Sequence, residues 1–281
     1  MRSMIELDRV SFTYPGGVRA VERVDLVLRD GEVVALMGGN GAGKTTLLKL
    51  MSGLLKPSEG TVRIDGLDTR RTPLNTIARL VGYVPQIAET LFFLESVEEE
   101  MLYALRNFGM LDRADRVVDL LRAFGLEGTE KRSPFTLSGG QKKRLSIAVV
   151  LAWEPKYLLL DEPTLGQDRA GRDAMMEVVR RLRDEGKTLV IATHDVEFVS
   201  ELSPRVVLMG RGRVLAEGRA EDVLTDEGLL REARVLPPQS VVISSRLEAM
   251  GVKKTSSFED LVLKLRSLLK SVGGCGEPEA R

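Results

Sequence analysis

The chain has 281 residues, 43% hydrophobic and 29% charged, as expected for a protein with a folded core. Its 41 basic residues balance its 41 acidic ones, so charge gives no argument for binding nucleic acid or an anionic membrane surface. A single cysteine, Cys275, excludes an internal disulfide framework and fits a reducing cytoplasm. The N-terminus lacks the apolar segment of a signal peptide, and the longest apolar run, residues 147–153, is too short for a membrane span. We therefore expect any role at a membrane to depend on partner proteins.

Residues 4–37 read as strands joined by turns at residues 15–17 and at Asp30-Gly31. The last strand of this series, residues 33–37, is apolar throughout, which is typical of a buried strand. It leads into a glycine-rich loop at residues 38–45, and residues 46–51 continue as a helix.

That loop fills all four fixed positions of the phosphate-binding pattern G-x-x-x-x-G-K-[ST]. Glycines let the backbone bend closely around a phosphate chain, and a helix N-terminus adds a favourable dipole. We expect Lys44 to reach the β- and γ-phosphates of a nucleotide and the Thr45 hydroxyl to ligate Mg²⁺. A glycine turn that binds nothing is the alternative. The predicted nucleotide-binding residues here are Gly38, Gly39, Asn40, Gly41, Ala42, Gly43, Lys44, Thr45 and Thr46.

Beyond the loop, the chain alternates between strands and helices, with an interruption. Strands are predicted at residues 61–64, 81–84, 157–160, 188–192, 206–209 and 214–217, and an amphipathic helix at residues 170–183. A mostly helical insertion at about residues 88–150 separates the second of these strands from the third, with helical patterns over residues 94–126 and 138–153. The sequence thus predicts an α/β fold.

After about residue 235 the pattern of apolar residues that indicates strands and helices weakens, and Pro237-Pro238 interrupts it. A last helix is predicted with one apolar face, followed by a frayed tail at residues 273–278. The residues of that face are Leu261, Leu265, Leu268, Leu269 and Val272. We expect a main domain over residues 1–235 and a helical extension over residues 236–281.

Polar side chains follow two of the buried strands. Asp161 and Glu162 end the strand at residues 157–160, and His194, the only histidine, follows the next strand. In an open α/β sheet the carboxyl edge of the strands is where ligands bind. We expect Asp161 to hold the Mg²⁺ shell, Glu162 to polarise an attacking water, and His194 to bond a phosphate oxygen. The alternatives are exposed acids at a strand end and a surface or core histidine.

Ser138, Gly139, Gly140 and Gln141 open a helix with a serine cap, a second helix N-terminus suited to an anion. Two helix N-termini of this kind and one lysine-bearing loop suggest that both sites bind the same phosphate. Two chains facing head to tail could then each complete the other's phosphate pocket. The basic run at residues 142–144 is predicted to form a solvated helix face, with nucleic-acid contact as a lesser alternative.

Two further residues are candidates for contact with a nucleotide. Tyr14, in the loop before Pro15, offers a flat surface on which adenine could stack, although a lone tyrosine is more often simple packing. Gln86 stands where the helical insertion begins, so its amide could touch Mg²⁺ or water and move with the insertion.

In order and spacing, these motifs resemble the ATP-binding cassette (ABC) ATPases over about residues 4–235. The segments that carry the likeness are residues 38–45, Gln86, 137–141, 158–164 and His194. Finer features resemble the ATPase subunits of energy-coupling factor importers, the cobalt/nickel and vitamin type. These are residues 12–16, the stretch from Ser96 to Gly109, and a C-terminal extension with paired prolines.

The resemblance implies a phosphate-loop NTPase core with an antiparallel β subdomain and a helical insertion that docks a membrane subunit. It implies that two subunits sandwich two ATP molecules, with the helix at Ser138 of one chain against the γ-phosphate held by the other. Glu162 would be the general base, His194 the switch residue and Gln86 the γ-phosphate sensor. Asp168, which follows the carboxylate strand, joins the predicted site, although Gln167 stands before it where the family usually has an apolar residue.

The sequence therefore predicts an ATPase at the cytoplasmic face of the membrane that powers import of a small solute, a metal ion or a vitamin, through a separate membrane complex. ATP and Mg²⁺ are the expected cofactors, and no nucleic-acid partner is expected. A soluble ABC ATPase acting on nucleic acid or an assembly complex is the first alternative, and a regulatory nucleotide-binding module is the second. The solute and the choice between an identical and a sister ATPase partner are not encoded in this chain.

Overall fold

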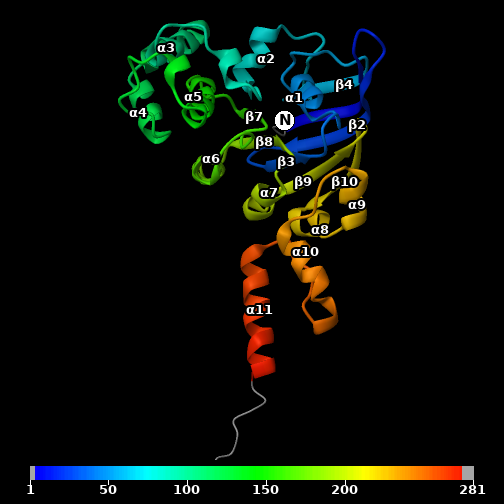
Figure 1. The fold of residues 1–281 in the computed structure, drawn as a ribbon. Coiled ribbons are helices and arrows are strands. Elements are labelled where there is room, and N and C mark those ends of the chain that lie inside the picture. Colours follow the sequence, from blue (N-terminus) through cyan, green and yellow to red (C-terminus); the bar gives the residue numbers. More distant parts are fainter. Residues whose placement is uncertain (1–3, 274–281) are drawn as a thin grey trace, which may run out of the picture.

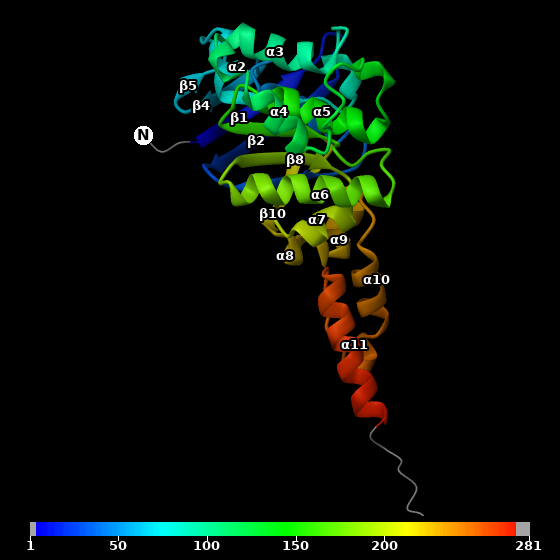
Figure 2. The same cartoon turned by 90° about the vertical axis from the view of Figure 1, so that its left-hand side faces the viewer.

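The computed structural model describes residues 4–273, so Cys275 and the predicted tail beyond Gly273 lie outside the described residues. The chain forms two sheets with helices around them, and α10 and α11 project from this body (Figures 1 and 2). Within residues 4–273 no helix is both long enough and apolar enough to cross a membrane.

The larger sheet has six strands in the order β10-β9-β3-β8-β7-β6. Five of them run parallel, and β10 pairs antiparallel with β9. β3, β7 and β8 are buried along their whole length, because their continuous apolar runs are covered on both faces. The strands are β3 (Val33–Met37), β6 (Val81–Val84), β7 (Tyr157–Asp161), β8 (Thr188–Thr193), β9 (Arg205–Gly210) and β10 (Arg213–Arg219).

The smaller sheet is antiparallel, in the order β2-β1-β4-β5. Its buried side chains share a core with α1 (Lys44–Met51), the helix that follows the phosphate loop. Its strands are β1 (Met4–Thr13), β2 (Arg19–Arg29), β4 (Glu59–Ile64) and β5 (Leu67–Asp68). Together the two sheets confirm the predicted α/β fold class with an antiparallel part.

A polar contact joins the two sheets. The carboxylate of Asp65, in the turn after β4, accepts a hydrogen bond of 2.5 Å from the Tyr157 hydroxyl at the start of β7. It also pairs with Lys156 at 2.7 Å and accepts from the backbone of Met4. Burial raises the pKa of Asp65, but the hydrogen bonds from Lys156 and Tyr157 outweigh it and hold that pKa below its usual value.

The helical insertion contains α3 (Val97–Phe108), α4 (Arg116–Ala123) and α5 (Gly139–Leu151). The predicted helical pattern over residues 94–126 is interrupted, because Gly109 ends α3 in the left-handed conformation with φ of 69°. Ser96 begins α3 with a capping box, in which its hydroxyl accepts from Glu99. Two helices border the larger sheet, α6 (Arg169–Asp184) and α7 (Val196–Leu202), while α2 (Leu74–Leu80), just before β6, was not predicted.

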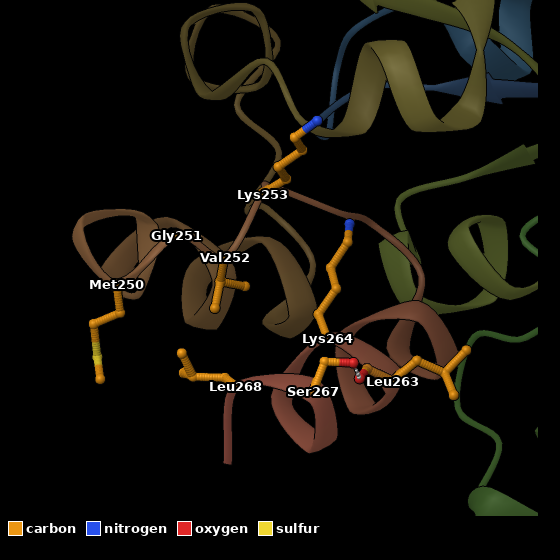
Figure 3. Close-up of a pocket in the computed structure, with 8 residues that line it drawn as sticks. All are labelled: Met250, Gly251, Val252, Lys253, Leu263, Lys264, Ser267 and Leu268. Carbon is orange, nitrogen blue, oxygen red and sulfur yellow. Dashed lines mark hydrogen bonds between the residues drawn. The ribbon is translucent and has the colours of Figure 1, made fainter. Parts of the chain in front are cut away.

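The last part of the chain is helical. It contains α8 (Ala220–Leu224), α9 (Glu227–Glu232), α10 (Gln239–Arg246) and α11 (Phe258–Gly273). The Ser256 carbonyl ties the extension to the body, since it accepts hydrogen bonds from Ser240 of α10 and from Ser200 of α7. The predicted apolar face of α11 is only partly covered, because Leu261 is buried whereas Leu269 is 70% exposed. Figure 3 shows a hollow on this extension, with Met250 and Val252 facing α11.

Candidate functional site

The phosphate loop joins the carboxyl end of β3 to the N-terminus of α1. Gly43 has φ of 102°, and a Cβ there would lie 2.4 Å from the Ala20 carbonyl oxygen, so only glycine fits this close approach. The Lys44 ammonium turns back over the loop and donates a 2.7 Å hydrogen bond to the Gly38 carbonyl. The loop thus holds a cationic side chain above the first turn of a helix, the arrangement that binds phosphate.

Parallel pairing sets β8 beside β3 and β7 beside β8, so their carboxyl ends meet at one edge. Asp161, the last residue of β7, is only 1% exposed and accepts hydrogen bonds of 3.1 Å from the hydroxyls of Thr45 and Tyr83. Burial raises the pKa of Asp161, and the negative charge of Glu162 adds to that shift. These contacts join the phosphate loop to the strand that carries the acids.

Glu162 lies between two predicted site residues. One carboxylate oxygen is 3.3 Å from the Lys44 ammonium, and the other is 2.9 Å from Nδ1 of His194. The Lys44 and Glu162 side chains are almost fully buried, whereas His194 is about half exposed. Glu162 has φ of 47°, the left-handed region that is costly for a residue with a long side chain and recurs at functional sites. The structure therefore brings two predicted site residues, Lys44 and His194, into contact with the carboxylate of Glu162.

A hollow of about 510 Å³ opens over these groups. It is lined by most of the predicted residues, and also by four that were not predicted, Val18, Arg19, Ala20 and Leu165. Residues 18–20 line the hollow because the start of β2 lies against the phosphate loop. The local sequence pattern does not reveal this contact. The predicted residues in its lining are Tyr14, Asn40, Gly41, Ala42, Gly43, Lys44, Thr45, Thr46, Gln86, Glu162 and His194.

Tyr14 stands at the rim of this hollow. Its hydroxyl is 3.1 Å from that of Thr46, and its ring meets Phe12 edge to face at 4.9 Å. The ring is therefore held in place beside the phosphate loop, where an adenine could lie against it.

The basic run at residues 142–144 does not form the predicted solvated face, and this expectation was wrong. Lys143 is 4% exposed, and its ammonium donates to the backbone carbonyls of Gln86 at 2.7 Å and Pro85 at 3.4 Å. Burial lowers its pKa to about 8. Lys142 pairs with Glu89 at 3.1 Å, and Arg144 donates to the Phe124 carbonyl. The run faces inward because the helix packs on the segment after β6.

The predicted second anion site begins α5. The Ser138 hydroxyl accepts from the backbone of Gln141, whose side chain bonds back to Ser138, a capping box. Ser138 and Gly139 are exposed and lie outside the hollow, so one chain does not bring them to its own phosphate loop. Asp168 also lies outside it and caps α6 by accepting from Gly171 at 2.8 Å.

Comparison with known proteins agrees with this geometry. Residues 21–165 match the family model described as ABC transporter. The energy-coupling factor transporter ATP-binding protein EcfA2 of Methanospirillum hungatei is 36% identical over 274 residues, 96% of this chain and 69% of that protein.

Solved structures give the same result. The cbiO1 structure from Clostridium perfringens, described as part of the ABC transporter complex cbiONQ, matches with a TM-score of 0.74 and 32% identity over 89% of this chain and 98% of that one. A dimeric bacterial ABC transporter cassette matches with a TM-score of 0.70 and 31% identity over 77% of this chain and 98% of that one.

The phosphate loop, the carboxylates at the sheet edge and these relatives agree, which confirms the resemblance found in the sequence. The chain belongs to the ABC transporter family and is an ATP-binding, ATP-hydrolysing transporter subunit.

Proposed function

We propose that this chain is the ATPase of an energy-coupling factor importer and powers uptake of a small solute, a metal ion or a vitamin, through a separate membrane complex. The observation that carries the proposal is the contact of Lys44 and His194 with one buried carboxylate, Glu162, beside the phosphate loop. A module that only binds nucleotide has no need of such a base. The similarity to EcfA2 and to cbiO1 supports the importer type.

In this proposal, ATP binding frees the catalytic base. Lys44 pairs with Glu162 at 3.3 Å, and both side chains are almost fully buried. A γ-phosphate in the hollow competes for the Lys44 ammonium, because phosphate carries more charge than the carboxylate and the loop donates to it as well. Glu162 then accepts a proton from the attacking water, and His194, held by Glu162, bonds the phosphate and orients that water.

The residues at the sheet edge fit Mg²⁺. The Thr45 hydroxyl and the Asp161 carboxylate are 3.1 Å apart, and Gln86, which is exposed, lines the hollow together with Thr45. These are oxygen ligands, and Mg²⁺ is bound through one or two protein groups together with substrate phosphates. No cluster of three or more His, Cys, Asp or Glu that could hold a metal occurs among residues 4–273, and a Mg²⁺ shared with ATP needs none. When bound, the ion would neutralise charge that develops on the transferred phosphoryl group.

We propose that the active form is a dimer with an identical or sister ATPase. Ser138, Gly139, Gly140 and Gln141 begin α5 away from the chain's own hollow, so a second chain is needed to use this capped helix end. A solved ABC transporter cassette with a TM-score of 0.70 is dimeric, which supports the arrangement. Asp168, exposed at the start of α6, lies on the loop that follows the carboxylates and would face the partner.

We assign residues 1–235 to the cassette, about residues 88–150 to its helical subdomain and residues 236–281 to an extension. The helical subdomain exposes apolar side chains, which supports docking of a membrane subunit at the cytoplasmic face. Ile87 is 61% exposed and Phe93 60%, and Phe93 stacks edge to face on the 38% exposed Tyr103. Large exposed apolar groups that lie close together are typical of protein interfaces.

The test is purification of the tagged chain from detergent-solubilised membranes, with its bound proteins identified by mass spectrometry. We expect an integral membrane protein to be recovered with the wild type and lost with Phe93→Glu, while Val118→Glu, at an exposed position on α4, keeps it. Recovery with nucleic acid or a soluble assembly, and no membrane protein, would favour the alternative of a non-transport ABC ATPase.

A further inference from the structure

Lys143 occupies a place that the mechanism above does not use. It lies on α5, five residues after the serine cap at Ser138, yet its side chain is buried. Its ammonium is 2.7 Å from the Gln86 carbonyl, 3.4 Å from the Pro85 carbonyl and 3.5 Å from the Asp161 carbonyl. One side chain therefore touches the segment after β6, the carboxyl end of β7 and the helix of the capped anion site.

These contacts match what a lysine can do. An ammonium has three donors and no acceptor, and three carbonyl oxygens lie around it. The carboxylates of Asp161 and Glu162 supply negative charge nearby, which helps to offset the cost of burying the cation. Removing the ammonium would leave three carbonyls without this donor, the Asp161 carbonyl in a buried contact, so the segments it joins would be free to shift.

We propose that Lys143 is a positioning residue that fixes the capped N-terminus of α5 relative to Gln86 and the Asp161 edge. In a single chain, Gln86 and Asp161 face the chain's own ATP, whereas the start of α5 serves the ATP of the partner. Lys143 thus transmits the state of one site to the helix that completes the other. This inference rests on the proposed dimer and adds a named link between its two sites.

A purely structural role predicts something different. A core lysine that only stabilises the fold would change thermal stability, and the folded molecules would still bind and hydrolyse ATP normally. A positioning role predicts that loss of Lys143 lowers turnover and leaves ATP affinity unchanged. ATP affinity of the single chain depends on the loop at Lys44 and stays near wild type, while steps that need α5 in the right place fail.

The experiment compares Lys143→Met and Lys143→Gln with Lys142→Met. Lys142 is a matched control, since it is the preceding residue of α5 and its ion pair with Glu89, whose side chain is 44% exposed, joins the same two segments. Ion pairs with an exposed partner contribute little. The measurements are thermal unfolding, affinity for a fluorescent ATP analogue, ATP-driven dimerisation by size exclusion, and kcat and KM for phosphate release.

We expect Lys143→Met to bind the analogue within about threefold of wild type, while kcat and ATP-driven dimerisation each weaken by about tenfold. Lys143→Gln keeps two donors and should recover part of the loss. If Lys143→Met fails to fold, the same split between affinity and kcat is sought in Lys143→Gln alone. Lys142→Met should match the wild type throughout.

Three outcomes would overturn the inference. The first is a lowered melting temperature with normal kcat per folded molecule, which is a structural role only. The second is an equal fall in affinity and kcat, and the third is an equal effect of Lys142→Met. Failure of the proposed dimer has a different signature, because the wild type would then not dimerise with ATP, and failure of the importer role would show as no membrane protein recovered with the wild type.

Discussion

Replacing Glu162 by glutamine tests the core of the proposed chemistry. The amide has nearly the same shape as the carboxylate, but it cannot accept a proton and carries no charge. We expect kcat for ATP hydrolysis to fall by about 10²- to 10⁴-fold, the usual contribution of a general base, or about 3–5 kcal/mol in the barrier. The loss should appear in kcat, with KM for ATP unchanged or lower.

The effect on ATP affinity follows from the Lys44 contact. At 3.3 Å the two unit charges attract by about 5 kcal/mol at an effective dielectric constant of 20, before the cost of desolvating both groups is subtracted. Glu162→Gln removes the negative charge that competes with the γ-phosphate for the Lys44 ammonium. We therefore expect ATP to bind about two- to tenfold tighter, since desolvation offsets most of the attraction. The ATP-bound dimer should accumulate, because the two chains separate only after hydrolysis and this step is blocked.

Three measurements on the purified chain check this prediction. Phosphate release gives kcat, titration of a fluorescent ATP analogue gives affinity, and size exclusion with ATP and Mg²⁺ reports the dimer. Glu177→Gln, on the exposed face of α6, is the matched control and should match the wild type in all three. Hydrolysis by Glu162→Gln at the wild-type rate would remove Glu162 as the base, and weaker ATP binding would contradict its competition for Lys44.

Three further predictions concern single residues. Lys44→Ala should weaken ATP binding by about 10- to 100-fold, because a charge-assisted contact to phosphate is lost, and unchanged affinity in the same titration would contradict the phosphate-loop assignment. His194→Ala should keep ATP affinity and lower kcat by about 100-fold, and a normal kcat would exclude its role in orienting the water. Asp65→Asn should lower the free energy of unfolding by about 1–3 kcal/mol at pH 7. Because the folded-state pKa of Asp65 is lowered, its contribution is present above the unfolded pKa and is lost as pH falls through the folded one. The difference from wild type in denaturant unfolding should thus shrink below about pH 4, and a difference independent of pH would refute the ionic contribution.

Local motifs explain why much of the site was predictable. Asp161 and His194 each stand at the end of a buried apolar run, Lys44 follows another such run across the glycine loop, and parallel pairing brings the ends of these runs to one edge. The contact of Lys44 with Glu162 was not predictable in detail. It depends on the left-handed backbone at Glu162, which no residue pattern near it signals.

Lys143 shows where pattern reading fails. Three consecutive basic residues on a helix normally face solvent, and nothing nearby in sequence indicates otherwise. Its partners, Gln86 and Asp161, are more than fifteen residues away in each direction. Only the folded chain therefore reveals that their carbonyls lie around the Lys143 ammonium. The exposed Leu269 is a similar case, since an apolar helix face predicts burial but not the surface that covers it.

We expect hydrolysis to be restricted to the ATPase dimer, and two features of the chain support this expectation. Glu162 is paired with Lys44, so under the proposed mechanism it can act as the base only after a phosphate has replaced it as the partner of the lysine. The capped helix at Ser138 lies outside the chain's own hollow, so the bound phosphate remains incompletely surrounded until a second chain supplies that helix. Hydrolysis would therefore follow only when ATP and a partner are both present, which is what a machine that converts ATP into movement of a membrane subunit requires.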